Sequence, residues 1–288
     1  MIRRLLVAVD SPRDSGQIIH YGARLAAATQ AELSILHVAR PGMDGEQEWP
    51  EERGTVQRKA FHAHRLALPG KRGETIARHA NDIDADLILM PACKRGALGQ
   101  LLFGSTSMDV IHRTNRPVWV AKPPFDTEWR FHGRRILCAV KLGEEGRNLL
   151  RYAAMWASAL QARLLLAHAV PLISEAMLAS YGLEDWGEIE LMPKAAHRKI
   201  ECMAEGIGVP YDVEVVTGGV ISNLKKLARR WGADLMIAGR GRNGFGENAG
   251  EIITRSPCPV ISYREEYREA EPVRETAGCR VLRFPRRG

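Results

Sequence analysis

Short apolar runs alternate along the chain with longer stretches in which apolar residues recur at helical spacing. The runs Leu5–Val9, Leu87–Met90 and Val118–Val120 contain no charged residue and are typical of buried strands. Residues 15–29 place apolar side chains on one side of a helix, and residues 31–38 return to a strand pattern. Strands that alternate with helices in this way predict an α/β fold with a parallel sheet.

The pattern occurs twice in the chain. A second strand, helix and strand follow one another from residue 134 onward. The same 131 residues separate Asp10 from Lys141 and His37 from His168, so this opening unit is repeated without a gap. The chain is therefore a duplication, and its two copies can be compared position by position.

The two copies differ in length at two places. Asp234 follows Asp86 by 148 residues, so the second copy carries 17 additional residues in its middle, which include a predicted helical region at 174–206. Pro259 follows Pro117 by 142 residues, so six residues are missing from the second glycine-bearing loop.

Two such copies predict tandem flavodoxin-like or Rossmann-like domains, each an open parallel sheet of order 3-2-1-4-5 with helices on both faces. In the second copy, residues 211–216 form a clear third strand. In the first copy the only candidate is 64–68, where the pattern of 55–66 favours a helix. We therefore expect the third strand of the first copy to be short or absent.

The boundaries of these parts follow from the repeat. Domain 1, with a shortened middle, is expected at 1–122, and domain 2, with a shortened glycine loop, at 134–263. A linker at 123–133, stiffened by prolines, separates them, and a basic tail occupies 264–288. A short and stiff linker favours two domains that pack together.

The last strands of the two sheets, at 118–120 and 260–262, carry unpaired backbone groups on one side. We expect these two strands to pair with each other, which makes a single chain resemble a twofold dimer. A further homodimer of whole chains remains open.

The composition of the 288 residues, 45% hydrophobic and 26% charged, is that of an ordinary globular protein. No apolar run reaches the roughly 18 residues that a membrane span needs, and the start lacks the pattern of a signal peptide, so we expect a cytoplasmic protein with no membrane partner. The five scattered cysteines fit reduced thiols. The net charge of +7 is partly in the tail, which favours a solvated segment over a specific nucleic-acid site.

Several segments together resemble the universal stress protein family. They are the opening strand that ends in VAVD, the strand AELSILHV, the helix start GSTSMDVI and the closing strands RPVWVAK and CPVIS. The resemblance covers both copies and implies a tandem universal stress protein, active in the stress response and without catalytic activity.

Family members that bind ATP carry a loop of glycine, two residues, glycine, nine residues and glycine followed by serine or threonine. The resemblance implies that the backbone amides of this loop hold phosphates and that an aspartate at the end of the first strand holds the nucleoside. It implies a first-domain site for ATP or a related adenine nucleotide, formed by Asp10, Val38, Met90, Lys94, Gly104, Ser105, Thr106 and Ser107.

Each copy departs from that loop. In the first copy the two leading glycine positions hold Pro91 and Lys94, of which the lysine could supply a cation for phosphate. The second copy keeps Gly239, Gly241 and Gly246.

Charged residues also alter the second copy. Lys141 replaces the aspartate that ends the first strand, and Glu247 replaces the hydroxyl residue that follows the last glycine. Arg240 and Arg242 could hold phosphate or could be ordinary solvated residues. Two readings stay open for the whole protein, a nucleotide-responsive regulator and an interaction scaffold that has lost its nucleotide.

Other candidate sites are weaker. His62 and His64 lack a third metal ligand, so no metal site is expected. His37 and His168 end equivalent strands, where hydrogen bonding within the fold is favoured over ligand contact. Cys93 lies beside Lys94, which could lower its pKa for a redox role.

We find no catalytic motif, so an enzyme is not expected. A third reading, the binding of an apolar ligand, concerns the enlarged middle of the second copy. Its residues are Leu172, Ile173, Met177, Leu178 and Tyr181.

Overall fold

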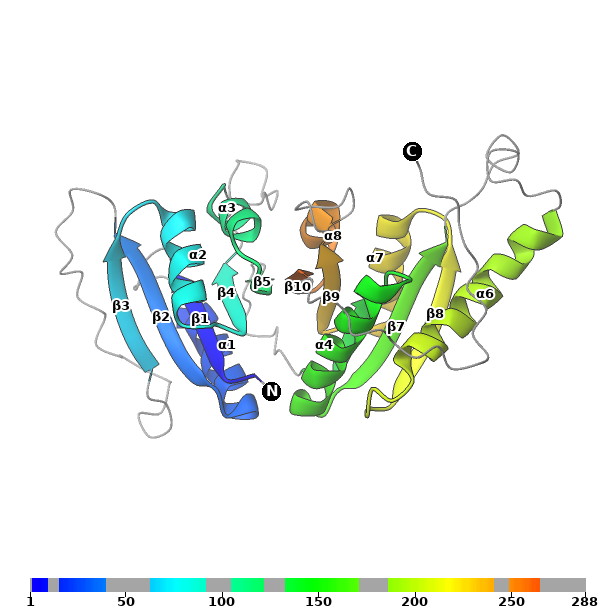
Figure 1. Ribbon diagram of the computed structural model, residues 1–288, viewed down its shortest axis with the longest axis horizontal. Coiled ribbons are helices and arrows are strands. Elements are labelled where there is room, and N and C mark those ends of the chain that lie inside the picture. The colour runs from blue at the N-terminus through cyan, green and yellow to red at the C-terminus, as the bar shows by residue number, and fades with distance from the viewer. Residues whose placement is uncertain are drawn as a thin grey trace.

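A single ten-stranded sheet runs through the molecule in the order β3-β2-β1-β4-β5-β10-β9-β6-β7-β8 (Figure 1). The computed structural model describes residues 2–9, 16–39, 63–91, 105–121, 133–170, 186–240 and 249–264. The first half of the sheet is built by β1 to β5 and the second half by β6 to β10. Each half has the predicted order 3-2-1-4-5, which confirms the α/β fold class.

The elements of the first half are β1 (Arg4–Val9), α1 (Gly16–Thr29), β2 (Glu32–Ala39), β3 (Ala63–Pro69), α2 (Arg72–Asp82), β4 (Leu87–Pro91), α3 (Ser105–Arg113) and β5 (Val118–Ala121). Those of the second half are β6 (Arg135–Ala139), α4 (Glu144–Leu160), β7 (Arg163–Val170), α6 (Trp186–Ala204), β8 (Tyr211–Thr217), α7 (Val220–Trp231), β9 (Leu235–Arg240), α8 (Ala249–Arg255) and β10 (Val260–Arg264).

The prediction of a short or absent third strand in the first half is wrong. β3 is as long as β8, and it pairs with β2 from Leu33 to Ala39 without a break. The predicted helix at 55–66 is also wrong where it overlaps β3. The reason is that β3 is an exposed edge strand, in which Ala63 packs against the core on one face and Leu66 and Leu68 on the other, so its sequence lacks the continuous apolar run of a buried strand.

The two halves join where β5 and β10 pair in antiparallel register. Val120 lies opposite Val260, Trp119 opposite Ile261, and Val118 opposite Ser262. Trp119 and Ile261 are equivalent positions of the repeat, so a local pseudo-twofold axis passes between them. The predicted pairing of the two last strands is thereby confirmed.

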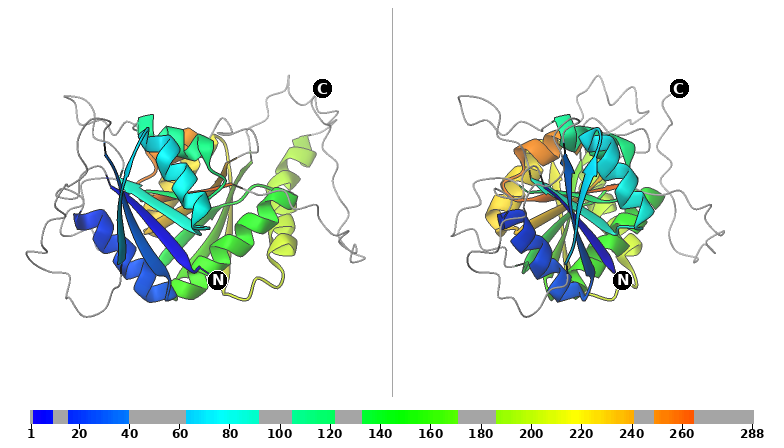
Figure 2. Two further views of the ribbon diagram at one scale, coloured as in Figure 1. Left: turned by 60° about the vertical axis from the view of Figure 1, so that its left-hand side comes forward. Right: turned by 90° about the vertical axis from the view of Figure 1, so that its left-hand side faces the viewer.

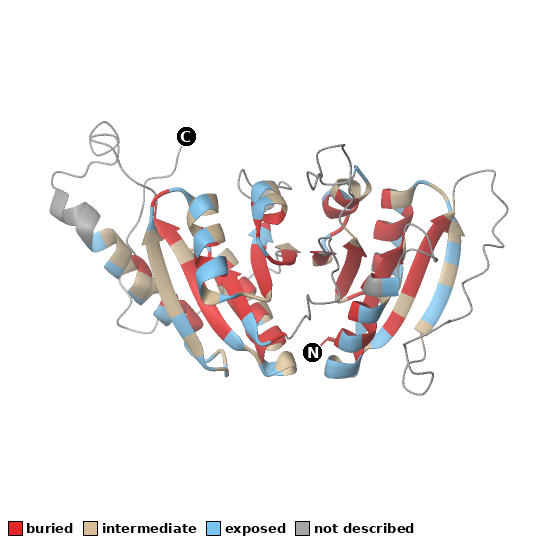
Figure 3. Ribbon diagram, turned by 180° about the vertical axis from the view of Figure 1, so that it is seen from behind, coloured by how far each residue is buried: buried red, intermediate tan, exposed pale blue. Residues whose placement is uncertain are grey.

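Helices cover both faces of the sheet. α1, α4 and α6 pack on one face, and α2, α3, α7 and α8 pack on the other. Figures 1 and 2 show α1 and α4 beneath the central strands and α3 and α8 above them. Buried residues gather on the inner strands and on the helix sides that face them, whereas the edge strands β3 and β8 are more exposed (Figure 3).

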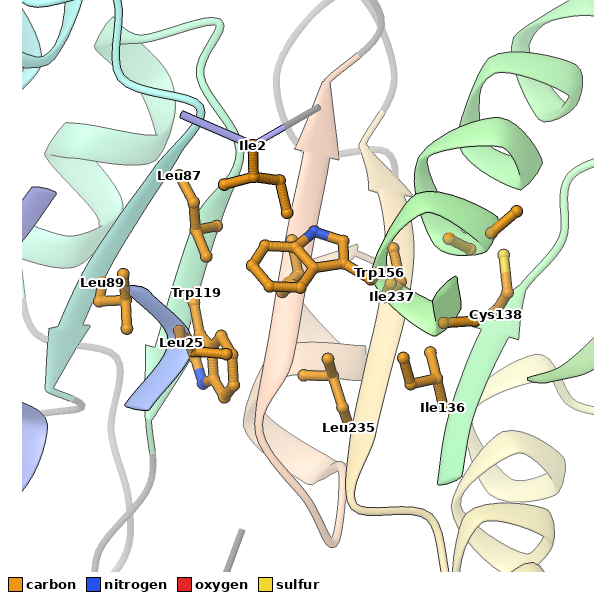
Figure 4. Close-up of a cluster of buried hydrophobic side chains, with 14 of the residues drawn as sticks. Ile2, Leu25, Leu87, Leu89, Trp119, Ile136, Cys138, Trp156, Leu235 and Ile237 are labelled. Atoms are coloured by element: carbon orange, nitrogen blue, oxygen red, sulfur yellow. The ribbon is translucent and has the colours of Figure 1, made fainter. Parts of the chain in front are cut away.

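The core on the α1 and α4 face continues across the join. Trp119 of β5 and Trp156 of α4 are fully buried in one cluster with Leu25, Leu87 and Ile261. Figure 4 shows the Trp156 ring extending from α4 toward the side chains of the first half. Because the two halves share this core, we expect them to unfold as one unit.

An equivalent aspartate in each half binds the amino end of the first strand of that half. Asp86 accepts hydrogen bonds from the backbone N–H groups of Arg3 (2.6 Å) and Arg4 (3.0 Å). Asp234 accepts them from Arg134 and Arg135, both at 3.0 Å. These repeated aspartates therefore fix the fourth strand of each half against the first.

Among the described helices, none has the length and apolar character needed to cross a membrane.

Candidate functional site

The candidate site of the first half lies at the carboxyl ends of its parallel strands. β1 pairs with β2 on one side and with β4 on the other, so the crevice outside its end is a topological switch point, where ligands of α/β proteins commonly bind. α3 connects β4 to the parallel β5, so its first turn lies at this same edge. In Figure 1 the arrowheads of β2, β3, β7 and β8 all point toward the top, so the corresponding edge of each half is on the same side of the molecule.

The first turn of α3 offers hydroxyl groups and no carboxylate. Ser105 is exposed, Thr106 is half-buried and Ser107 is buried. A helix start combines free backbone N–H groups with the positive end of the helix dipole, which favours anions such as phosphate. In the second half, α8 is shorter and has Glu251 in its first turn, which disfavours an anion there.

Val38 and Met90 come from the strand ends on either side of β1, as predicted, yet their side chains are both only 3% exposed. They pack in the core beneath α2 and α3 together with Ala8 and Ile88. Pro91 ends β4 beside Ala121. Since proline has no backbone N–H, this first glycine position of the loop offers no amide to a phosphate.

Gly239 lies near the end of β9, opposite Tyr263 of β10. Five other site residues predicted from the sequence lie outside the described residues, namely Asp10, Lys94, Gly104, Gly241 and Gly246, and so do Cys93, Arg242 and Glu247. The same holds for the linker up to residue 132, for the tail from residue 265 onward and for the five residues of the predicted apolar ligand site.

Lys141 has a partner in the second half. Its ammonium group forms an ion pair with Glu145, at the start of α4. Gly146 packs so closely on the Lys141 carbonyl oxygen that a Cβ there would collide with it. The position that corresponds to the nucleoside-binding aspartate therefore holds a lysine on a tight turn, and a lysine side chain has no acceptor for a sugar hydroxyl.

Arg240 does not face the carboxyl edge of its own half. The side chain is 3% exposed and reaches into the first half, where it donates hydrogen bonds to the carbonyl oxygens of Thr114 (2.8 Å) and Arg116 (2.9 Å) and to that of Ile111. The interpretation of Arg240 as a phosphate ligand or a solvated residue is therefore wrong. The pairing of β5 with β10 carries the end of β9 toward α3, and the sequence of one loop gives no hint of that contact.

Burial, and to a smaller extent the charge of the nearby Arg264, lowers the pKa of Arg240 to about 9. The guanidinium is still charged at neutral pH. A buried cation is tolerated when hydrogen-bond acceptors surround it, and here three backbone carbonyls serve that purpose.

The two strand-end histidines play equivalent parts in the fold. The Nδ1 of His37 lies 3.3 Å from the carbonyl oxygen of Val9, and that of His168 lies 2.9 Å from the carbonyl oxygen of Val140. Burial lowers the pKa of His168, against the opposing effect of this hydrogen bond. Each ring thus donates a hydrogen bond to a backbone carbonyl at the end of the first strand of its own half, in agreement with the favoured structural interpretation.

His64 is exposed on β3, and the described residues contain no group of three His, Cys, Asp or Glu side chains that could hold a metal ion. The thiol of Cys138 is buried and its pKa is raised far above the usual range by that burial.

Comparisons with known proteins agree on the family. A universal stress protein from Mycolicibacterium smegmatis is 29% identical over 140 residues, which is 40% of this chain and 47% of that protein. The chain thus matches about half the length of this curated relative.

Solved structures of tandem size share the fold. A putative universal stress protein from Pseudomonas aeruginosa UCBPP-PA14 superposes with a TM-score of 0.71 at 17% identity and covers 91% of this chain and 93% of its own. A universal stress protein from Archaeoglobus fulgidus DSM 4304 gives a TM-score of 0.63 at 17% identity and covers 91% of this chain and 98% of its own. The model of the universal stress protein family matches residues 1–122 and 133–264, and the chain therefore belongs to this family.

Proposed function

We propose that this protein is a non-catalytic, cytoplasmic stress-response protein that responds to ATP or a related adenine nucleotide bound by its first half. The observation that carries the proposal is the first turn of α3, with Ser105, Thr106 and Ser107 and no acidic residue, at the switch point beside β1. In the sequence, Asp10, the carboxylate that the family resemblance assigns to the nucleoside, directly follows Val9, the last residue of β1.

The proposed division of roles is simple. The start of α3 supplies backbone N–H groups and hydroxyls to the phosphates, and Asp10 accepts hydrogen bonds from the sugar. Lys94 adds a positive charge from the loop that precedes α3. The second half does not bind nucleotide in this proposal, because Lys141 is paired with Glu145 and Glu251 opens α8.

The alternative candidate is a scaffold that binds no nucleotide. Pro91 favours it, because the loop position that it occupies lacks an N–H donor.

Calorimetry on the intact chain with magnesium and ATP separates the two candidates. The proposal expects a dissociation constant on the order of micromolar for the wild type. Gly104→Val places a side chain at the start of α3 and is expected to weaken binding at least about tenfold, by steric exclusion of the phosphate. Gly246→Val changes the equivalent glycine of the second half and serves as the matched control, with unchanged affinity.

The absence of both heat and a thermal shift at millimolar ATP would support the scaffold. An equal loss in the two glycine variants would contradict the assignment of the nucleotide to the first half.

A further inference from the structure

Arg240 of the second half binds the end of the same helix whose start is proposed to hold phosphate. We infer that Arg240 is a positioning residue for the nucleotide site of the first half, so that its contact with α3 and the binding of nucleotide strengthen each other. The inference rests on the proposed function and adds a regulatory role for the second half.

The contact is made where α3 lacks hydrogen-bond partners. The last carbonyl groups of a helix find no N–H donor within the helix itself. The Val110 carbonyl accepts the N–H of Thr114 at 3.0 Å, and the next carbonyl, that of Ile111, accepts from Arg240. Two further bonds from Arg240 reach the turn between α3 and β5. One side chain therefore holds the last turn of α3 and the connection that follows it.

The charge of Arg240 also suits this place. A cation near the carboxyl end of a helix interacts favourably with the negative end of the helix dipole. No carboxylate of the described residues forms an ion pair with Arg240, so the backbone carbonyls are its main known acceptors. Loss of the guanidinium would leave the Ile111 carbonyl, in a buried position, without this donor.

The first half has no arginine at the equivalent position of its sequence. The turn after α8 repeats the local hydrogen bonds of the turn after α3, with Ser256 donating to the Ile252 carbonyl and its hydroxyl accepting from the N–H of Cys258. By the spacing of Asp86 and Asp234, the residue equivalent to Arg240 is Ala92, which carries no donor on its side chain. The contact thus runs from the half with the shortened glycine loop to the half whose helix α3 begins with three hydroxyl residues.

A helix as short as α3 transmits such a contact along its length. It has nine residues, and an isolated helix of that length is marginal in water. The guanidinium at its end and the anion at its start therefore order the same element. By thermodynamic linkage, a contact that orders the helix at one end strengthens binding of the ligand at the other end. The effect is reciprocal, so the ligand also strengthens the contact.

The test uses the full chain with three variants. Arg240→Met keeps a long buried side chain and removes the donors, and Arg240→Lys keeps the charge. Arg230→Met removes an exposed arginine of the same half, one that pairs with Glu214, and is the control. Calorimetry gives the affinity for magnesium and ATP, and hydrogen exchange followed by mass spectrometry gives the protection of residues 105–116 with and without ATP.

We expect Arg240→Met to weaken ATP binding about fivefold or more and to speed exchange in 105–116, with partial recovery in Arg240→Lys and no change in Arg230→Met. In the wild type, ATP should slow exchange at 110–116, far from the phosphate, and this effect should be reduced in Arg240→Met. A residue with a purely structural role would lower stability without altering that response to ATP.

Two results overturn the inference. One is wild-type ATP affinity in an Arg240→Met protein that is folded by circular dichroism, or in Arg240→Lys if the methionine variant does not fold. The other is an equal effect of Arg230→Met. If the wild type binds no ATP, the proposed function fails together with the coupling, and faster exchange in Arg240→Met without ATP then shows that the contact only supports the fold.

Discussion

Asp86 and Asp234 hold the same place in the two halves, and each accepts two backbone N–H groups at the amino ends of the strands. At the carboxyl ends the halves differ. The first half has a helix start with three hydroxyls, whereas the second has the Lys141–Glu145 ion pair and an arginine buried in the other half. The contact at the amino ends is thus the same in both halves, whereas the residues at the carboxyl ends differ.

The difference also shows what a duplicated site can become. Arg240, the last residue of β9, belongs to the join between the halves, where it binds backbone of the first half. A residue beside the glycine loop of the second half thus serves the interface. Variants at equivalent positions of the two halves test how far this comparison holds.

The largest effects are expected at the join between the two halves. Trp119→Ala should lower the free energy of unfolding by about 3–5 kcal/mol, and Ile261→Ala, its paired equivalent, by about 2–5 kcal/mol, because both side chains are fully buried. Denaturation in urea measures both. Leu191→Ala, at a side chain that is 58% exposed, should change stability by no more than about 0.5 kcal/mol. A join variant that unfolds in two separate transitions would show that the halves do not share one core.

An intermediate and symmetric effect is expected at the amino ends of the strands. Asp86→Ala and Asp234→Ala each remove an acceptor of two backbone N–H groups, so each should cost about 1–3 kcal/mol, with the two losses nearly equal. The exposed Glu205→Ala removes the same charge and is the control in the same urea titrations. A loss in only one half would contradict the symmetry of this edge.

The smallest effect concerns pH. Because burial lowers the pKa of His168 in the folded protein, the unfolded chain binds a proton more readily than the folded one as pH falls through about 6.5, the ordinary pKa of a histidine. His168 thus contributes a loss of stability below about pH 6.5. His168→Gln should therefore show a shallower fall in melting temperature than the wild type between pH 7 and 5. His64→Gln, which removes an exposed ring, is the control, and identical slopes for all three proteins would contradict the prediction.

Much of the fold could be predicted from the sequence, because buried parallel strands such as Leu5–Val9 and Leu87–Met90 have continuous apolar runs, and the repeat supplies a second copy of each. The strand at 63–69 is longer than predicted, because an edge strand buries little and its polar residues His64 and Arg65 interrupt the apolar pattern. The local sequence therefore predicts a strand well where both faces of the strand are buried, and poorly where the strand lies at the edge of the sheet.

The candidate site was predictable only in part. The hydroxyl-rich start of α3 follows from local sequence, as does the loss of an amide at Pro91. The role of Arg240 could not be foreseen, because it depends on which backbone the pairing of β5 with β10 brings near the end of β9. Tertiary contacts between halves are not encoded in the spacing of one loop.

The number of nucleotides bound per chain tests the central claim most directly. Native mass spectrometry with magnesium and ATP should find one nucleotide per chain in the wild type. Asp10→Ala should abolish it, and Lys141→Ala, the equivalent change in the second half, should leave one nucleotide bound. Two nucleotides per chain, or one that persists in Asp10→Ala and disappears in Lys141→Ala, would contradict the division of roles between the halves.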